Sequence, residues 1–152
     1  MTLKAGDKVP HFSVPDDQGH MVTPEQFQKG TTVFFFYPKD DTPGCTKESC
    51  EFRDLMPAFR DRNIAVYGIS ADDTSSHQAF RSKYDLNFPL LADTDRTLCR
   101  MFGVWGMQEW KGKTYEGIAR TTFVINSEGV VDRVYENVNP VGHADEVLKN
   151  CP

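Results

Sequence analysis

Two cysteines at positions 45 and 50 follow a run of turn residues and have the spacing to carry thiol chemistry. The run before them is Pro38-Lys39-Asp40-Asp41-Thr42-Pro43-Gly44. A cysteine is a nucleophile as its thiolate, and a helix N-terminus favours that form through its unpaired N–H groups and its dipole. Thr42 is a suitable N-cap, and Pro43 suits the first helical position. We therefore expect Cys45 to be a nucleophilic thiolate in the first turn of a helix.

The flanking segments predict the elements that hold this site. Residues 31–37 form a short apolar run rich in β-branched and aromatic side chains, which indicates a strand buried on both faces, and Pro38 ends it. After the turn, apolar residues recur at helical spacing, namely Phe52, Leu55, Met56 and Phe59. A buried strand leading directly into a helix N-terminus would hold Cys45 rigidly.

Helical geometry separates the two thiols. Projected around a helix, Cys45 shares the inward face with Phe52, whereas Cys50 points roughly the opposite way. Residues five apart lie about 8.7 Å from each other between Cα atoms, and a disulfide needs less than about 7 Å. A disulfide between these cysteines therefore requires the first turns to unwind. We also expect Pro57 to kink or divide the helix, because it cannot donate a hydrogen bond to the Arg53 carbonyl.

The segment around both cysteines resembles a known family. Residues 36–50, with the sequence FYPKDDTPGCTKESC, resemble the peroxiredoxins, and closely the bacterioferritin comigratory protein, or peroxiredoxin Q, branch. The likeness continues at residues 3–7, 12–13, 67–70, 102–106 and 112–118. It implies an α/β thioredoxin-like fold with an N-terminal β-hairpin extension and a central mixed sheet flanked by helices. Residues 1–152 would form one such domain.

The resemblance also implies roles for individual residues. Cys45 matches the peroxidatic cysteine, and Cys50 matches the resolving cysteine of the branch that closes a disulfide within one helix. Thr42 matches the hydroxyl that hydrogen-bonds substrate and thiolate. Arg120 matches the distant arginine, whose permanent charge and several donors suit a thiolate and a peroxide.

The implied activity is a thioredoxin-dependent peroxidase of the atypical two-cysteine type. It would reduce hydrogen peroxide and organic hydroperoxides to water and alcohols through a Cys45 sulfenic acid, which Cys50 resolves as an intramolecular disulfide. Thioredoxin or a similar dithiol would restore both thiols.

Pro38 and Pro43 match prolines that shape and shield the pocket. We expect no cofactor and no metal. The chain lacks the Gly-Gly-Leu-Gly segment and the C-terminal Tyr-Phe helix of readily overoxidised members, which favours a monomer.

Composition and charge argue against some classes of binding partner. The chain has 152 residues, of which 39% are apolar, and a net charge of −5 without clusters of basic residues, which argues against a nucleic-acid surface. The N-terminus has no apolar signal core, and no segment approaches the roughly 20 apolar residues of a membrane span. We therefore expect no membrane association and a cytoplasmic location.

Other interpretations of the cysteines remain open. A thiol–disulfide oxidoreductase acting on proteins would also use a nucleophilic cysteine, although the Cys-x4-Cys spacing and the preceding Thr-Pro-Gly favour the peroxidase. A zinc site would need all four cysteines, and Cys45 and Cys50 diverge on a helix. Cys99 is expected to be half-buried, with a resolving role as the alternative, and Cys151 is expected to be an exposed thiol near the C-terminus.

The remaining patterns predict ordinary structure. His11, His20, His77 and His143 are interpreted as surface or hairpin residues. Asp40 and Asp41 are interpreted as turn residues whose charges oppose thiolate formation. The aromatic stretch of Trp105, Trp110 and Tyr115 is expected to form a packed loop. The predicted elements are a hairpin turn at residues 15–19, a capping-box helix from Thr23, strands at 64–70, 89–92, 121–126 and 130–135, a helix with Phe80 and Tyr84, a helix from Asp93 or Asp95, and a helix at 143–150.

Overall fold

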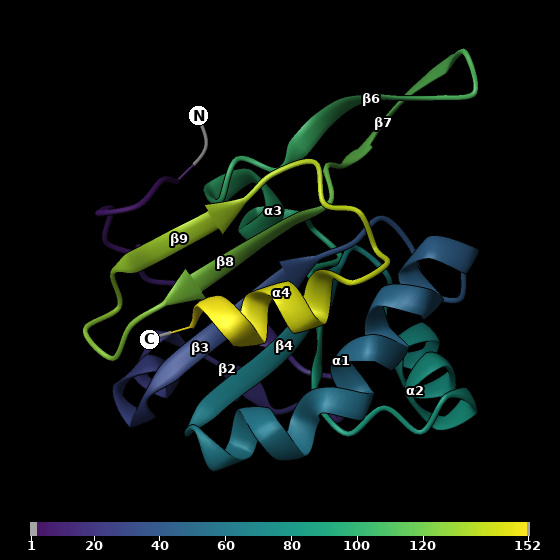
Figure 1. The fold of residues 1–152 in the computed structure, drawn as a ribbon. Helices are drawn as coiled ribbons and strands as arrows, with labels where there is room; N and C mark the ends of the chain where they lie inside the picture. Colours follow the sequence, from purple (N-terminus) through teal and green to yellow (C-terminus); the bar gives the residue numbers. More distant parts are fainter. Residues whose placement is uncertain (1–2, 152) are drawn as a thin grey trace.

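A mixed five-stranded sheet forms the centre of the chain in the computed structural model, which describes residues 3–151 (Figure 1). Its strand order is β5-β4-β3-β8-β9. Strands β3, β4 and β5 are parallel, and β8 and β9 continue the sheet antiparallel. The bounds are β3 (Thr31–Phe36), β4 (Ile64–Ser70), β5 (Leu90–Ala92), β8 (Thr121–Ile125) and β9 (Val131–Tyr135). The expected central mixed sheet is confirmed.

Helices and a small N-terminal sheet cover the two faces of this sheet. On one face lie α1 (Pro43–Asp61), α2 (Thr74–Lys83) and α4 (His143–Asn150), and Figure 1 shows α1 and α4 on the same side. On the other face lie α3 (Thr97–Met101), the hairpin of β1 (Val14–Pro15) and β2 (Met21–Val22), and the 3-10 helix η1 (Pro24–Lys29). No helix of residues 3–151 is both long and apolar enough to cross a membrane.

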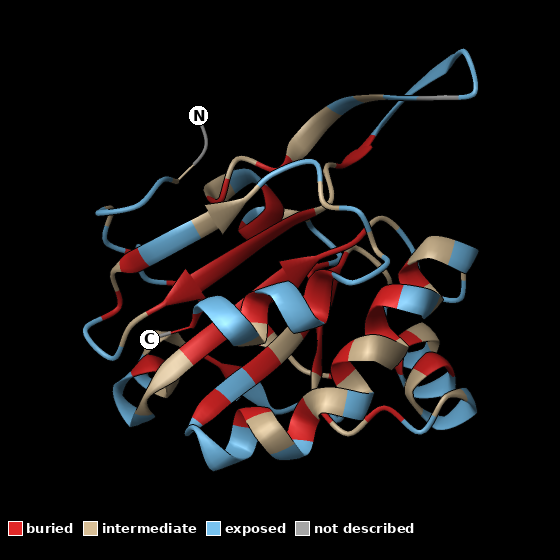
Figure 2. Ribbon diagram, viewed as in Figure 1, coloured by how far each residue is buried: buried red, intermediate tan, exposed pale blue. Residues whose placement is uncertain are grey.

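Strand β3 is buried on both faces, as its apolar sequence predicts. Val33, Phe35 and Tyr37 pack under α1, α2 and α4, whereas Phe34 and Phe36 pack into the core on the opposite face. Figure 2 shows β3 and β8 buried along almost their whole length. Each such side chain contributes about 1.5–3 kcal/mol when it is fully buried. The strand that leads into the Cys45 segment is therefore firmly fixed.

One local prediction needs correction, and of the two outcomes expected at Pro57, a kink or a division, the structure excludes the division. Thr23 precedes η1, but its side chain makes no capping hydrogen bond, and the element is a 3-10 helix rather than a helix with a capping box. Helix α1 runs without a break through Pro57. The Arg53 carbonyl, which Pro57 leaves without its helical donor, accepts a hydrogen bond of 3.2 Å from the side-chain amide of Asn87. That replacement partner explains why the helix is not divided.

The expected packed loop around the aromatic stretch is wrong. Strands β6 (Trp105–Trp110) and β7 (Lys113–Ile118) form an antiparallel hairpin that extends away from the body of the protein (Figure 1). Its two turn residues, Lys111 and Gly112, have φ values of 50° and 77°, which suit a tight hairpin turn. Met107 is 67% exposed, and Tyr115 is 42% exposed. This hairpin leads directly to the segment that carries Arg120.

Candidate active site

Cys45 lies in the first turn of α1, as its sequence context predicts. Thr42 is the N-cap in an extended conformation, and Pro43 begins the helix. The first hydrogen bond of the helical ladder runs from the N–H of Thr46 to the Thr42 carbonyl, at 2.8 Å. The N–H groups of Gly44 and Cys45 therefore precede the ladder, where a helix has its positive end. The Cys45 side chain is 1% exposed and faces the core with Phe52.

Arg120 reaches Cys45 from the other side of the site. Its Nη2 donates a hydrogen bond of 3.4 Å to the sulfur of Cys45. Its Nη1 donates a hydrogen bond of 2.8 Å to Oε1 of Glu48, which lies one helical turn after Cys45. Burial opposes the charge of Arg120, but Glu48 and Cys45 outweigh that effect and raise the pKa of the guanidinium above its ordinary value. The site thus brings a permanent positive charge to the sulfur.

Glu48 is a site residue that the sequence reasoning missed. Its side chain is fully buried, and burial raises its pKa from 4.5 to about 7, although Arg120 partly offsets the shift. Its Oε2 is buried without a hydrogen-bond partner. The available signal was its position three residues after Cys45, which places both side chains on one helix face. The carboxyl orients the guanidinium that faces the sulfur.

Gly44 allows the guanidinium to come this close. A Cβ atom at this position would lie 3.1 Å from Nη2 of Arg120 and 3.6 Å from Cγ of Pro140. The first of these distances is tighter than ordinary van der Waals contact, so a side chain here would push Arg120 away. Glycine at this position therefore allows Arg120 to lie close to the start of α1.

Thr42 and the two prolines lie around the same helix start. The Thr42 hydroxyl donates a hydrogen bond of 2.9 Å to the Lys39 carbonyl, so its proton points to the preceding loop and its lone pairs remain available as acceptors. Pro38 is half-buried between β3 and the loop, and Pro43 is exposed at the helix start. All three belong to the segment that surrounds Cys45.

The other cysteines do not join Cys45. Cys50 is half-buried on the same intact helix, and both thiols are free. Cys99 is fully buried in the core on the opposite face of the sheet, and Cys151 is 6% exposed rather than exposed as expected. The Cys151 carbonyl accepts a hydrogen bond from Arg62, which holds the chain end against α1. Burial raises the pKa of both the Cys99 and the Cys151 thiols. The structure therefore does not assemble the four cysteines as metal ligands.

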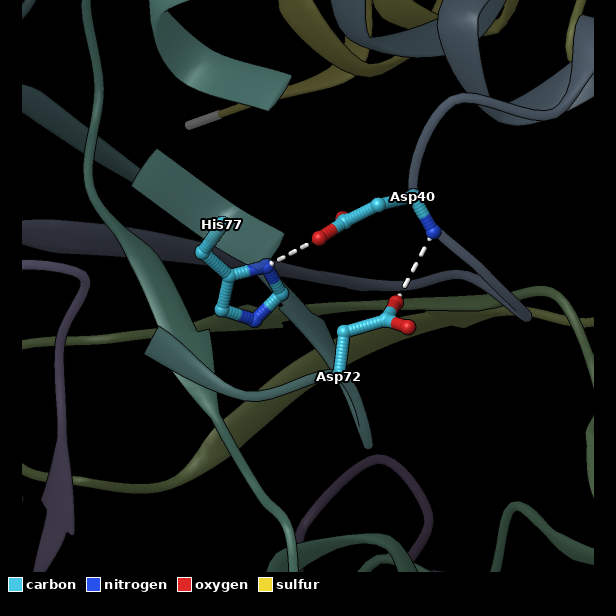
Figure 3. Close-up of side chains that lie close together, drawn as sticks. All are labelled: Asp40, Asp72 and His77. Atoms are coloured by element: carbon cyan, nitrogen blue, oxygen red, sulfur yellow. Dashed lines mark hydrogen bonds and ion pairs between the residues drawn. The ribbon is translucent and has the colours of Figure 1, made fainter. Parts of the chain in front are cut away.

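Asp40 and His77 are not the turn and surface residues that the sequence suggested. Asp40 is 8% exposed, and His77 is completely buried. Oδ2 of Asp40 lies 2.7 Å from Nδ1 of His77, and the Asp40 N–H donates a hydrogen bond of 2.8 Å to Asp72 (Figure 3). The neighbouring Asp41 is exposed and pairs with Lys83 at 2.7 Å. Both charges that were expected to oppose the thiolate are thus balanced by their own partners.

His143 also differs from its prediction as a surface residue. It is 3% exposed at the start of α4, where Nε2 lies 2.7 Å from the Thr122 hydroxyl and Nδ1 lies 3.1 Å from Glu146. Its ring packs edge-on against Phe52 of α1. Burial lowers the pKa of His143, and the nearby Glu146 carboxylate only partly offsets this effect. This residue links α4 to the helix that carries Cys45.

One group of side chains has the composition of a metal site. Among residues 3–151, Asp40, Asp72 and His77 offer ligand atoms within 4.8 Å of one another. Each of these side chains already bonds to protein groups, because Asp40 also accepts from Tyr37 and Ser76, and Asp72 accepts from Ser70. The three side chains therefore already form a hydrogen-bond network with one another and with protein groups.

The chain is similar to known proteins over most of its length. Residues 5–134 match the model of the AhpC/TSA family. The chain is 42% identical to Peroxiredoxin Bcp of Escherichia coli K12 over 146 residues, which cover 96% of this chain and 94% of that protein. A solved structure of a PrxQ mutant from Xylella fastidiosa superposes with a TM-score of 0.91 at 33% identity, covering 98% of this chain and 95% of that one. The bacterioferritin comigratory protein of Xanthomonas campestris, which is described as having alkyl peroxide reduction activity, gives a TM-score of 0.85 at 37% identity, covering 91% of this chain and 88% of that one.

Proposed function

The chain belongs to the AhpC/TSA family, in which it is a thiol peroxidase with the thioredoxin-like fold of the Bcp and peroxiredoxin Q proteins, and we propose that Cys45, Arg120, Thr42 and Cys50 carry out its reaction. Its substrate is a hydroperoxide, and a thiol reductant completes the cycle. The observation that carries the proposal is the 3.4 Å hydrogen bond from Arg120 to the sulfur of Cys45 at a helix N-terminus.

In the first step, the thiolate of Cys45 attacks one peroxide oxygen. A sulfur–oxygen bond forms, the oxygen–oxygen bond breaks, and the leaving oxygen takes up a proton and departs as water or an alcohol. Arg120 stabilises the thiolate and the charge that develops on the peroxide oxygens. The Thr42 hydroxyl, with two acceptor lone pairs, accepts a hydrogen bond from the peroxide. Pro38 and Pro43 restrict the approach to the sulfur.

In the second step, Cys50 condenses with the sulfenic acid of Cys45. A sulfur–sulfur bond forms, and the sulfenic hydroxyl leaves with a proton as water. The intact helix keeps the two Cα atoms about 8.7 Å apart, which exceeds the limit of about 7 Å for a disulfide. The first turns of α1 must therefore unwind, and the Arg120–Glu48 contact must open with them.

A dithiol protein of the thioredoxin type completes the cycle by supplying two electrons and two protons to the disulfide. The substrate class includes alkyl hydroperoxides as well as hydrogen peroxide, because the Xanthomonas campestris relative is described by its alkyl peroxide reduction activity. The protein is proposed to act as a monomer in the cytoplasm, without a metal or an organic cofactor.

Steady-state peroxide consumption with thioredoxin as reductant tests this function. Cys45→Ser should abolish turnover, and Cys50→Ser should stop turnover with thioredoxin after the first equivalent of peroxide. Cys151→Ser is the matched control, because Cys151 packs in the same core as Cys45 but lies outside the site. Turnover that survives Cys45→Ser would overturn the proposal.

A further inference from the structure

The loop that joins β3 to α1 is held by one buried side chain. Within residues 37–42, Asp40 accepts three hydrogen bonds, from the Tyr37 hydroxyl at 2.6 Å, the Ser76 hydroxyl at 2.8 Å and the His77 ring at 2.7 Å. Its N–H is bound by Asp72 at 2.8 Å. Ser76 and His77 belong to α2 and Asp72 follows β4, so these contacts fix the loop to α2 and to the segment after β4, five residues before Cys45. Figure 3 shows Asp40 with His77 and Asp72.

The contact between Asp40 and His77 requires a proton. Nε2 of His77 lies 2.9 Å from the Leu91 carbonyl, which only accepts, so Nε2 carries a hydrogen. Nδ1 lies 2.7 Å from a carboxylate oxygen, and without a second proton two lone pairs would face each other there. A proton between Nδ1 and Oδ2 of Asp40 turns this contact into a hydrogen bond, and the hydroxyls of Tyr37 and Ser76 donate to the same carboxyl group.

The surroundings of His77 retain this proton. Burial opposes the charge on the ring, but the hydrogen bond and charge of Asp40, the Leu91 carbonyl and the charge of Asp72 outweigh it and raise the pKa of His77 above its ordinary value. The ring of Tyr37, 6.5 Å away between centroids, completes the contacts, and burial raises the pKa of Tyr37 well above its ordinary value, so its hydroxyl stays a donor.

The other side-chain contacts of the loop lie at the surface. Asp41 is in the left-handed region with φ 58°, which is a sparsely populated conformation for a residue with a side chain. Asp41 pairs with Lys83 and also accepts a hydrogen bond of 2.6 Å from the Tyr84 hydroxyl, but both contacts are exposed, and exposed ion pairs contribute little to stability. Thr42, the N-cap of α1, follows directly. The position of the helix start therefore depends mainly on the buried Asp40 contact.

We propose that Asp40 and His77 are positioning residues for the thiol reaction, because their shared proton anchors the loop that places the first turn of α1 with Cys45 against Arg120. Loss of that proton or of either partner frees the loop, slows the attack of Cys45 on peroxide and favours the unwound helix in which Cys45 and Cys50 can join. The effect on the two chemical steps rests on the proposed function, whereas the anchoring itself does not.

Two substitutions of His77 separate its two hydrogen bonds. The side-chain amide of His77→Asn can donate from near the Nδ1 position to Asp40, whereas that of His77→Gln can donate from near the Nε2 position to the Leu91 carbonyl and leaves Asp40 without this donor. Neither variant can titrate. Asp17→Asn is the matched control, because Asp17 is a buried carboxylate that binds Arg81 of the same helix α2 and does not contact the loop.

Hydrogen exchange of the reduced proteins tests the anchor without any peroxide. In His77→Gln, residues 38–49 should exchange about ten- to a hundredfold faster than in wild type, as expected for loss of a hydrogen bond to a charged group. His77→Asn and Asp17→Asn should exchange in this segment nearly as wild type does. Raising the pH past the loss of the His77 proton should speed exchange of residues 38–49 more in wild type than in His77→Asn, which keeps the titrating Glu48 but lacks the titrating ring, after correction for intrinsic exchange. This arm decides the proposal even if His77→Gln does not fold.

Stopped-flow oxidation with hydrogen peroxide tests the consequence for the chemistry. His77→Gln should form the Cys45 sulfenic acid about tenfold more slowly and close the Cys45–Cys50 disulfide faster, and His77→Asn should restore both rates. Asp17→Asn reports the effect of a general loss of stability, because it removes a buried contact of α2 that does not reach the loop. Equal rates and equal exchange in the Gln and Asn variants, or the same changes in Asp17→Asn, would overturn the proposal. A wild-type protein that forms no sulfenic acid would instead refute the proposed function and leave the exchange result to decide the anchor.

Discussion

Glu48 accepts a 2.8 Å hydrogen bond from Arg120 inside the protein, with the carboxyl fully buried at one side of the guanidinium. The other side of the same guanidinium faces the sulfur of Cys45 at 3.4 Å. A buried carboxyl is costly unless it is paired, and burial here raises its pKa to about 7. The strength of the hydrogen bond between Glu48 and Arg120 should therefore change with pH close to neutrality.

Replacing Glu48 with glutamine should slow sulfenic acid formation about tenfold at pH 8, because a neutral amide holds the guanidinium less strongly than a carboxylate does. The difference from wild type should shrink below pH 6, where Glu48 is itself neutral. Stopped-flow measurement with hydrogen peroxide gives these rates. Asp54→Asn on the same helix is the control, because Asp54 is exposed, pairs with Arg53 and lies outside the site. Equal rates for wild type and Glu48→Gln at pH 8 would refute this role.

Titration of Glu48 should also make the free energy of unfolding depend on pH. The pKa of Glu48 is raised from 4.5 to about 7 by burial, so the folded state binds a proton that the unfolded state has already released between these values. Glu48 contributes to the free energy of unfolding in full below pH 4.5. This contribution falls by about 3 kcal/mol as the pH rises to about 7. Urea unfolding of wild type and Glu48→Gln from pH 4.5 to 8 measures it. The free energy of unfolding of wild type should fall relative to the variant, and parallel curves would contradict the assignment.

Gly44→Ala tests the close approach of helix and arginine. A Cβ atom 3.1 Å from Nη2 should displace the guanidinium by a few tenths of an ångström and slow the peroxide step about three- to tenfold. Alanine is the better helix former by about 1 kcal/mol, so the variant should unfold no more easily than wild type. Peroxide kinetics and thermal unfolding, measured together, separate the two effects. A slow variant that is also strongly destabilised would argue against a local displacement.

Oxidation should unwind only the first part of α1. The later part is held from outside, because Arg53 donates a hydrogen bond of 2.7 Å to the Tyr84 carbonyl and its own carbonyl binds Asn87. Hydrogen exchange of the disulfide form should therefore show lost protection at residues 44–51 and retained protection at residues 54–61. Loss of protection along the whole helix would show that these contacts do not stop the unwinding, and full protection throughout would contradict unwinding itself.

Much of the fold follows from local patterns in the sequence. The apolar run at residues 31–37 and the turn before Cys45 predicted β3, the start of α1 and the inward direction of Cys45, because one short segment carries the whole signal. The strand at Ile64–Ser70 and the helix at His143–Asn150 were predicted with their observed bounds. The β6–β7 hairpin was missed because its turn, Lys111-Gly112, lacks the usual asparagine or aspartate before glycine.

The site was less predictable because its contacts join distant segments. Glu48 could have been placed by its helical spacing from Cys45, but nothing local shows that it meets Arg120, which is 72 residues away. Asp40 and His77 are 37 residues apart and meet only through the packing of α2 against the sheet. Their residue types are also common on surfaces, so burial was the missing information. The resemblance to peroxiredoxins supplied Arg120, which composition and periodicity alone would not have singled out.

Mass spectrometry of the reduced protein after one equivalent of hydrogen peroxide tests the central claim most directly. Wild type should lose two hydrogens in a peptide pair that links Cys45 to Cys50. Cys50→Ser should instead accumulate a trapped sulfenic acid at Cys45, with one equivalent of peroxide consumed in both proteins. A link from Cys45 to Cys99 would reassign the resolving cysteine, and slow oxidation of all four cysteines without preference would contradict the account.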